Sequence, residues 1–299
     1  MYVSNRRVVS GLAMALVAVA CGSPSSGSGS HGGSSSGSIL APSSSGAGIT
    51  DPGSGGGSSS GGTSQSDAGF ESNGALTITI RDFQMWTAGG TNPDFNNETG
   101  DDRGIVESTI GTDGKPVYAH GSGTTATTHG ATYFNQWYND VPGTNINVQY
   151  PITLSQNASG TYGYDSLVSG VPLSSTNATK EFFPIDDGSQ YQTAFGNQGE
   201  PHNYSFTTEL HTIFTYNGGE TFSFSGDDDV FVFINGTLAI DLGGVHNREV
   251  AQVQLDSLGL TIGNDYPLDL FGAERHVIES NVSFTTTLVL RQAPPTGVR

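Results

Sequence analysis

The stretch GDDDVFVFING, from Gly226 to Gly236, joins three consecutive carboxylates to a short apolar run. Val230–Ile234 carries no polar side chain, and the Asn235-Gly236 pair that follows is a strong hairpin-turn signal. A run this short, apolar and bounded by turn residues predicts a strand that is buried on both faces. The sequence therefore places Asp227–Asp229 at the end of a buried strand.

Period-two alternation of apolar and polar residues continues on both sides of this stretch. It is clearest at Leu76–Ile80 and at Phe206–Phe214, and clusters of Gly, Asn, Asp and Pro separate such runs. The stretches 89–104 and 155–179 are polar and are predicted to be loops inserted between strands. Together these patterns predict an all-β, antiparallel β-sandwich with long loop insertions.

Several motifs occur in order from roughly Leu76 to Leu290, and they include GIVESTIGTDGKPVY, FNQWYNDVPGTN, GDDDVFVFINGTLAIDLGGVH and FGAERH. Through these motifs the chain resembles the fibro-slime domain family, known from bacterial surface proteins and secreted slime-mould proteins. More distantly, the chain resembles the protective-antigen-type β-sandwich of toxins, glycosidases and flocculins. That resemblance implies that Asp227 and Asp228 bind calcium and help to hold a sugar, whereas Asp229 occupies a position that is often Gly.

The residues themselves also suggest a cation site. Adjacent carboxylates repel one another unless a cation or strong donors lie between them, and hard oxygen ligands suit calcium. Calcium takes six to eight oxygens, and a hairpin at Asn235-Gly236 would return Asp241 toward the triplet. We therefore predict Asp227, Asp228 and Asp241 as metal ligands, and predict as further ligand-binding residues Asp229, His246, Asn247, Glu274 and Arg275.

Three alternatives to this site are open from the sequence. The Asp triplet could be a solvated turn before a strand, where Asp is common. Arg275 could pair with an Asp of the triplet in place of a metal. His246, a lone histidine after a Gly-Gly turn, could be a structural hydrogen-bonding group, and no spacing for a zinc site accompanies it.

Composition excludes several classes of function. The formal net charge is −18, which disfavours nucleic acid, because its phosphates need Lys and Arg. No GxSxG elbow, P-loop or dinucleotide fingerprint occurs outside the Ser/Gly-rich tract, and the one cysteine follows a hydrophobic leader. The sequence thus predicts a binding protein and not an enzyme.

The N-terminus has the features of a bacterial lipoprotein signal. Arg6 and Arg7 precede an apolar segment that ends at Ala18-Val19-Ala20-Cys21, which resembles a lipobox. A reactive thiol at Cys21 is the competing interpretation. We predict a signal peptide over residues 1–20, a Ser/Gly-rich flexible tether over 21–69, the fibro-slime domain over 70–292 and a tail over 293–299.

The leading hypothesis is a bacterial lipoprotein at the cell surface or outer membrane, with a calcium-dependent carbohydrate-binding and adhesion domain. Its partners would be an extracellular or cell-surface glycan and, through acylated Cys21, the lipid membrane. One alternative is a structural protein of the extracellular matrix that associates with copies of itself. A carbohydrate-active enzyme is a weaker alternative.

Lipidation makes the first testable prediction. The mature protein should incorporate labelled fatty acid and partition into detergent, and Cys21→Ser should abolish both properties. Gly22→Ser, one residue further on, should leave both intact. A detergent-free secreted form that begins at Cys21 and carries a free thiol would contradict the prediction.

Overall fold

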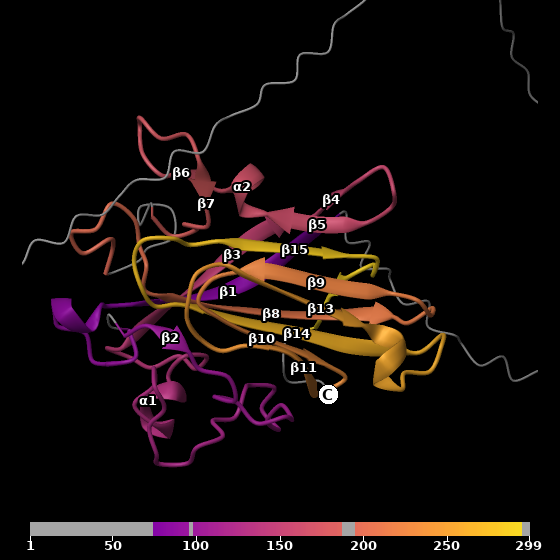
Figure 1. The fold of residues 1–299 in the computed structure, drawn as a ribbon, viewed down its shortest axis with the longest axis horizontal. Helices are drawn as coiled ribbons and strands as arrows, with labels where there is room; N and C mark the ends of the chain where they lie inside the picture. The colour runs from indigo at the N-terminus through magenta and orange to yellow at the C-terminus, as the bar shows by residue number, and fades with distance from the viewer. Residues whose placement is uncertain (1–73, 96–97, 187–194, 295–299) are drawn as a thin grey trace, which may run out of the picture. The chain divides into compact units, whose positions relative to one another are not determined.

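Two antiparallel sheets form a β-sandwich in the computed structural model, which describes residues 74–95, 98–186 and 195–294. Figure 1 shows the sheets layered on each other. In the described residues the larger sheet has the order β11-β10-β14-β8-β1-β3, with β16 also paired to β8. Its strands are β1 (Ala75–Phe83), β3 (Asn145–Thr153), β8 (Phe206–Thr215), β10 (Asp229–Ile234), β11 (Thr237–Leu242), β14 (Asp265–Glu274) and β16 (Arg291–Gln292).

The second sheet has the order β13-β9-β15-β5-β4 within the described residues. Its strands are β4 (Ser155–Gln156), β5 (Tyr162–Asp165), β9 (Thr221–Gly226), β13 (Glu249–Gln254) and β15 (Val282–Thr286). Short pairs form between β2 (Gly100–Asp101) and β12 (Gly244–Val245), and between β6 (Val171–Pro172) and β7 (Lys180–Glu181). The helical turns are η1 (Trp86–Ala88), α1 (Ala131–Phe134), α2 (Ser166–Ser169) and η2 (Leu255–Leu258).

The predicted sandwich is thus confirmed, but one predicted insertion is wrong. Residues 155–179 contain β4 and β5, which extend the second sheet beyond β15. These two strands have only two and four residues, with the sequences Ser-Gln and Tyr-Gly-Tyr-Asp, so they are too short to show the hydrophobic alternation that reveals a strand. The predicted signal peptide and nearly all of the predicted tether domain and tail lie outside the described residues.

Strand β10 is buried on both faces, as the sequence predicted. Val230, Val232 and Ile234 point into the core between the two sheets. Phe231 and Phe233 point the other way, into a second hydrophobic cluster. The hairpin to β11 turns at Asn235 and Gly236, which both have positive φ (52° and 75°). This is the backbone geometry that an Asn-Gly hairpin turn requires.

The second cluster exists because a third layer covers the outer face of the larger sheet. This layer consists of residues 84–95 and 98–144 between β1 and β3, drawn in purple and magenta with α1 and β2 in Figure 1. It contributes mainly aromatic and aliphatic side chains, namely Phe95, Ile105, Val106, Tyr118, Phe134, Trp137 and Tyr138. They pack on Phe231, Phe233 and Phe271 of the sheet. A sheet face that would otherwise meet water is therefore buried.

A network of charged side chains also joins this layer to the sheet. Glu209 on β8 is 4% exposed and accepts hydrogen bonds from Arg81 (2.6 Å) and Lys115. His211 lies with Nε2 2.6 Å from Glu209 and Nδ1 2.7 Å from Asp269. Carboxylates only accept, so both contacts are satisfied when the imidazole carries two protons.

The pKa values of this network follow from burial and charge. Burial alone would lower the pKa of His211, but the hydrogen bonds and charges of Asp269 and Glu209 outweigh it and raise the pKa. Burial would raise the pKa of Glu209, but His211, Arg81 and Lys115 lower it to about 2. The network is therefore held together by a charged His211.

The second prediction concerns stability against pH. Because the pKa of His211 is raised in the folded state, its stabilisation is full below the ordinary histidine value of about 6.5 and disappears as the pH rises through the folded value. The free energy of unfolding should therefore fall as the pH rises above about 6.5, and His211→Gln should flatten that fall. His120→Gln, at an exposed histidine, should keep the wild-type slope in the same urea titrations. Equal slopes in His211→Gln and wild type would show that His211 is neutral.

Candidate functional site

The Asp triplet lies where the chain crosses from one sheet of the sandwich to the other. Asp227 and Asp228 form a bend between β9 of the second sheet and β10 of the larger sheet. A second crossing, residues 275–281, leads from β14 back to β15. The two crossings are hydrogen-bonded together, since Asp227 accepts from the backbone (2.5 Å) and side chain (2.7 Å) nitrogens of Asn281.

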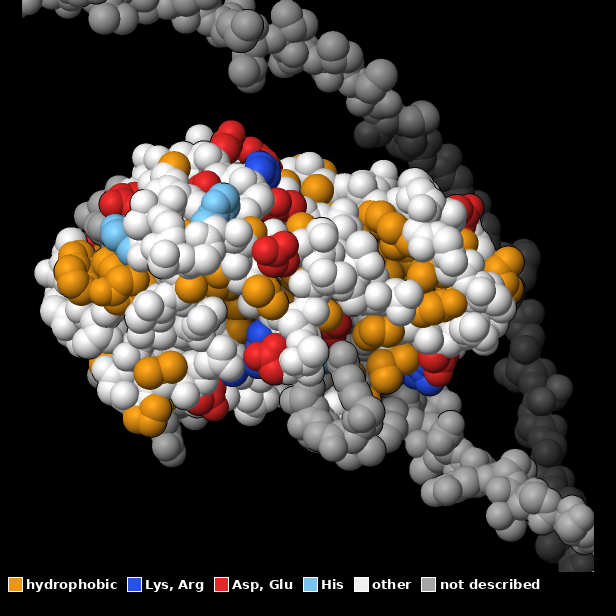
Figure 2. Space-filling view, turned by 90° about the horizontal axis from the view of Figure 1, so that it is seen from below, with side chains coloured by type: hydrophobic (Ala, Val, Ile, Leu, Met, Phe, Trp, Pro, Cys, Tyr) orange, Lys and Arg blue, Asp and Glu red, His pale blue; other side chains and the backbone are white. Residues whose placement is uncertain are grey.

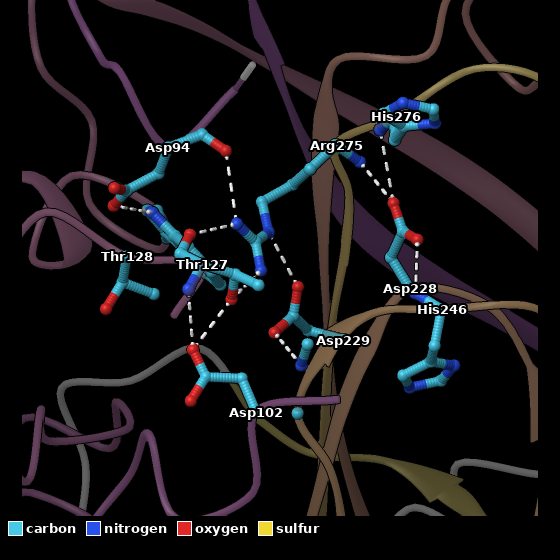
Figure 3. Close-up of polar contacts among 12 residues, drawn as sticks. Asp94, Asp102, Thr127, Thr128, Asp228, Asp229, His246, Arg275 and His276 are labelled. Carbon is cyan, nitrogen blue, oxygen red and sulfur yellow. Dashed lines mark hydrogen bonds and ion pairs between the residues drawn. The ribbon is translucent and has the colours of Figure 1, made fainter. Parts of the chain in front are cut away.

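Asp228 receives backbone N–H groups from both sides of the crossing, as Figure 3 shows. One carboxylate oxygen accepts from the amides of Arg275 (2.9 Å) and His276 (3.1 Å), and the other accepts from the amide of His246 (3.2 Å). Burial raises the pKa of Asp228 to about 8, although Arg275 opposes the shift. Burial likewise raises the pKa of Asp227, against the hydrogen bonds of Asn281.

Asp229 and Arg275 lie in the interior and bind each other. The Arg275 guanidinium donates to Asp229 through Nε (2.7 Å), and the two side chains are 1% and 0% exposed. It also donates to the carbonyls of Asp94 (3.1 Å) and Thr127 (2.7 Å) and lies 4.6 Å from the centre of the Trp137 ring. The expectation that Asp229 and Arg275 contact a ligand is therefore corrected, because neither reaches the surface. The alternative in which Arg275 pairs with an Asp of the triplet describes their geometry.

A hollow of about 640 Å³ opens above Asp227 and Asp228. His246 and Asn247, two of the predicted ligand-binding residues, also lie on its wall. Three further carboxylates line it, and the loop after His276 forms one side. The acidic residues of the wall are Asp101, Asp227, Asp228, Glu249 and Glu279. This hollow, called the crossover pocket below, is the candidate site.

Asp241 and Glu274 do not line the crossover pocket. Asp241 accepts hydrogen bonds from the amides of Gly104 (2.8 Å) and Gly243 (3.0 Å), so it holds loop backbone and is not gathered with Asp227 and Asp228. Glu274 is 5% exposed, and its Oε1 has no hydrogen-bond partner among the described residues. Burial and the charges of Asp228 and Asp227 raise the pKa of Glu274 well above its usual range.

His246 holds the pocket wall through several contacts. Its backbone amide donates to Asp228, and its ring lies 2.9 Å from the carbonyl oxygen of Asn247 and 3.2 Å from that of Leu242. These contacts fix the loop after β11 beside the Asp pair. These contacts agree with the alternative stated from the sequence, in which His246 is a structural hydrogen-bonding group.

Sequence reasoning missed Asp101, Glu249 and Glu279 as wall residues. Asp101 arrives through the pairing of β2 with β12, which matches Asp101 with Gly244. Gly244 has φ 115°, and an added Cβ there would lie 2.4 Å from the carbonyl oxygen of Gly100. The pairing of β2 with β12 joins segments that are more than a hundred residues apart, and no local sequence pattern marks it. No signal in the sequence could therefore have identified Asp101 as a residue of the pocket.

Comparison with known proteins gives one family and a set of relatives. Residues 159–296 match the model of the PA14 domain. The chain is 41% identical over 208 residues to protein psiR of Dictyostelium discoideum, a match that covers 67% of this chain and 20% of psiR. It is 39% identical over 206 residues to protein psiD (65% and 38%) and 36% identical over 233 residues to protein psiC (74% and 42%) of the same organism. The chain spans less than half the length of each of these relatives.

Among solved structures, the PA14 domain of the antifreeze protein MpAFP is similar at a TM-score of 0.32 and 8% identity, with 75% of this chain and 86% of that chain covered. The stretch that matches the PA14 model, residues 159–296, contains the Asp triplet and both crossings.

The third prediction tests the buried ion pair. Arg275→Met removes the partner of a fully buried carboxylate, which should lower the free energy of unfolding by about 3–5 kcal/mol. Adding Asp229→Asn should restore part of this loss, because the unpaired charge is then gone. Arg103→Met, which breaks the half-exposed pair with Glu249, should cost less than about 1 kcal/mol in the same urea titrations. A loss as small for Arg275→Met would contradict the assignment.

Proposed function

We propose that the crossover pocket binds carbohydrate and that the protein serves in adhesion at a cell surface. The observation that carries the proposal is the hollow of about 640 Å³, whose lining includes Asp227 and Asp228. The PA14 match supports the proposal, since that domain is known for carbohydrate binding and adhesion. The oxygens of acidic side chains accept hydrogen bonds from hydroxyl groups, and five acidic residues line the pocket.

Calcium is part of the proposal. Asp227 accepts two N–H groups and Asp228 accepts three, whereas a carboxylate offers about four lone-pair sites. Both carboxylates therefore keep acceptor capacity on the pocket side. No three His, Cys, Asp or Glu side chains in the described part of the chain are grouped to hold a metal. The rest of the six to eight oxygens would come from loop carbonyls, water or sugar hydroxyls. Bound calcium would place a compensating positive charge beside the carboxylates of Asp227 and Asp228.

The last part of the proposal is that the protein is displayed at the cell surface. The support for this part comes from the sequence. Cys21 and its lipobox-like context are the support for a lipid anchor in a bacterial membrane. Across the described ranges, no helix has the length and apolar character needed to cross a membrane. The anchor, the tether and the folded part would together present the crossover pocket to glycans outside the cell.

The fourth prediction tests the pocket on a glycan array with the full chain. Binding should disappear with EGTA and return with calcium, and Asp228→Asn should remove it. Asp101→Asn, on the wall, should weaken binding about two- to tenfold, as expected for one lost hydrogen bond. Asp241→Asn, a carboxylate outside the pocket, should bind as wild type does. Calcium at one hundred times its dissociation constant should also stabilise wild type by about 2.7 kcal/mol.

Each contrary outcome removes a different part of the proposal. Glycan binding that survives EGTA would remove calcium and keep the pocket. Calcium-sensitive self-association without glycan binding would support the matrix function. Turnover of a polysaccharide would make the protein an enzyme. If Asp228→Asn unfolds, Asp101→Asn and Asp241→Asn still distinguish the pocket from the loop beside it.

A further inference from the structure

A second hollow, of about 360 Å³, lies on the outer face of the five-stranded sheet. It is formed by β4, β5, β15 and α2, which lie together in Figure 1. On these strands Tyr164 and Phe284 point into the core. Their neighbours Gly163, Ser283 and Thr285 therefore face outward, because adjacent residues of a strand alternate between faces. None of the residues that line this hollow lines the crossover pocket.

The middle of the hollow has no side chain. Ser155, Gly163 and Thr285 are direct neighbours across three adjacent strands. With strands about 4.8 Å apart, the two hydroxyl-bearing residues stand about 10 Å apart across a bare glycine. A Cβ at Gly163 would lie 2.7 Å from the carbonyl oxygen of Phe284, so this position is restricted to glycine. The result is a notch in the sheet face with a hydroxyl on each side.

The hydroxyl groups of this hollow are available for binding. Within the described residues, the side chains of Ser155, Ser283 and Thr285 make no hydrogen bond to protein, whereas Asn157 is occupied by the amides of Ser159 and Thr161 (3.0 Å each). Val168, 69% exposed, adds an apolar edge.

The hollow carries almost no charge. Asp165 is the one charged residue on its wall, and its carboxylate accepts from the amide of Leu167 (3.0 Å), where it caps α2. The crossover pocket, by contrast, has five carboxylates on its wall. The two hollows therefore suit ligands of different chemistry.

We propose that the notch at Gly163 is a second binding site, for a neutral, hydroxyl-rich ligand of the oligosaccharide class. Free hydroxyls can both donate to and accept from the hydroxyls of such a ligand. A charged ligand would lose hydration here without gaining an opposite charge, and burial of an unpaired charge is costly. The exposed Val168 offers an apolar surface to the C–H groups of a sugar. The volume is within the 300–1,000 Å³ of small-molecule sites.

Affinity electrophoresis of the full chain tests the site. Native gels would contain a neutral polysaccharide (dextran, mannan or xylan, in separate gels) or the acidic polygalacturonate, all with EGTA and with Asp228→Asn as the parent, so that the crossover pocket is silent. At least one neutral polymer should retard the parent chain, and polygalacturonate should not. Thr285→Val, which removes one hydroxyl and keeps the shape, should weaken binding about two- to tenfold.

Matched variants separate this site from the sheet surface in general. Thr285→Lys, in the notch, should abolish retardation. Gln252→Lys is also exposed, on β13 of the same sheet, and should not. Equal effects of the two lysine variants, or no retardation by any neutral polymer, would overturn the site and leave these hydroxyls as a solvated sheet face. Because the crossover pocket is silent throughout, failure here does not bear on the proposed function.

Discussion

The buried pair between Arg275 and Asp229 is the interaction on which the rest of the structure depends. One guanidinium joins the larger sheet, through Asp229, to the third layer, through the carbonyls of Asp94 and Thr127 and the face of Trp137. A charge taken out of water is tolerated only where partners satisfy it fully. The third layer provides these partners, so its loops are held on the sheet by a cation and not only by apolar packing.

The same residue also holds Asp228, which lines the crossover pocket. The Arg275 side chain points inward to Asp229, while its backbone amide donates to Asp228. The position of Asp228 is therefore coupled to the pair in the interior. This explains why three adjacent Asp residues behave differently, since Asp229 belongs to β10 whereas Asp227 and Asp228 form the bend before it. On the face of the molecule that Figure 2 draws, by comparison, the acidic side chains lie in scattered groups.

The sequence was sufficient for the sandwich, for β10 and for the turn at Asn235-Gly236, because those features are local patterns of polarity. It was not sufficient for the third layer, whose aromatic residues lie in irregular segments without periodicity. Asp241 shows the limit most clearly. The hairpin does return it toward the triplet, but it pairs opposite Phe231. Asp241 therefore lies on the face of the sheet that the third layer covers. A hairpin in the sequence shows that two residues come close together, but it does not show on which face of the sheet each side chain lies.

The place of the candidate site follows from a requirement of the fold. Where a chain crosses between sheets, its N–H groups lose their partners in the ladder and must find others. At the two crossings, Asp227 and Asp228 accept those N–H groups. Their structural role brings carboxylates close together at low exposure, and burial together with the repulsion of neighbouring acidic groups raises their pKa. A cation or a set of hydroxyl donors would relieve that repulsion, so the structural requirement and the proposed binding chemistry involve the same two residues.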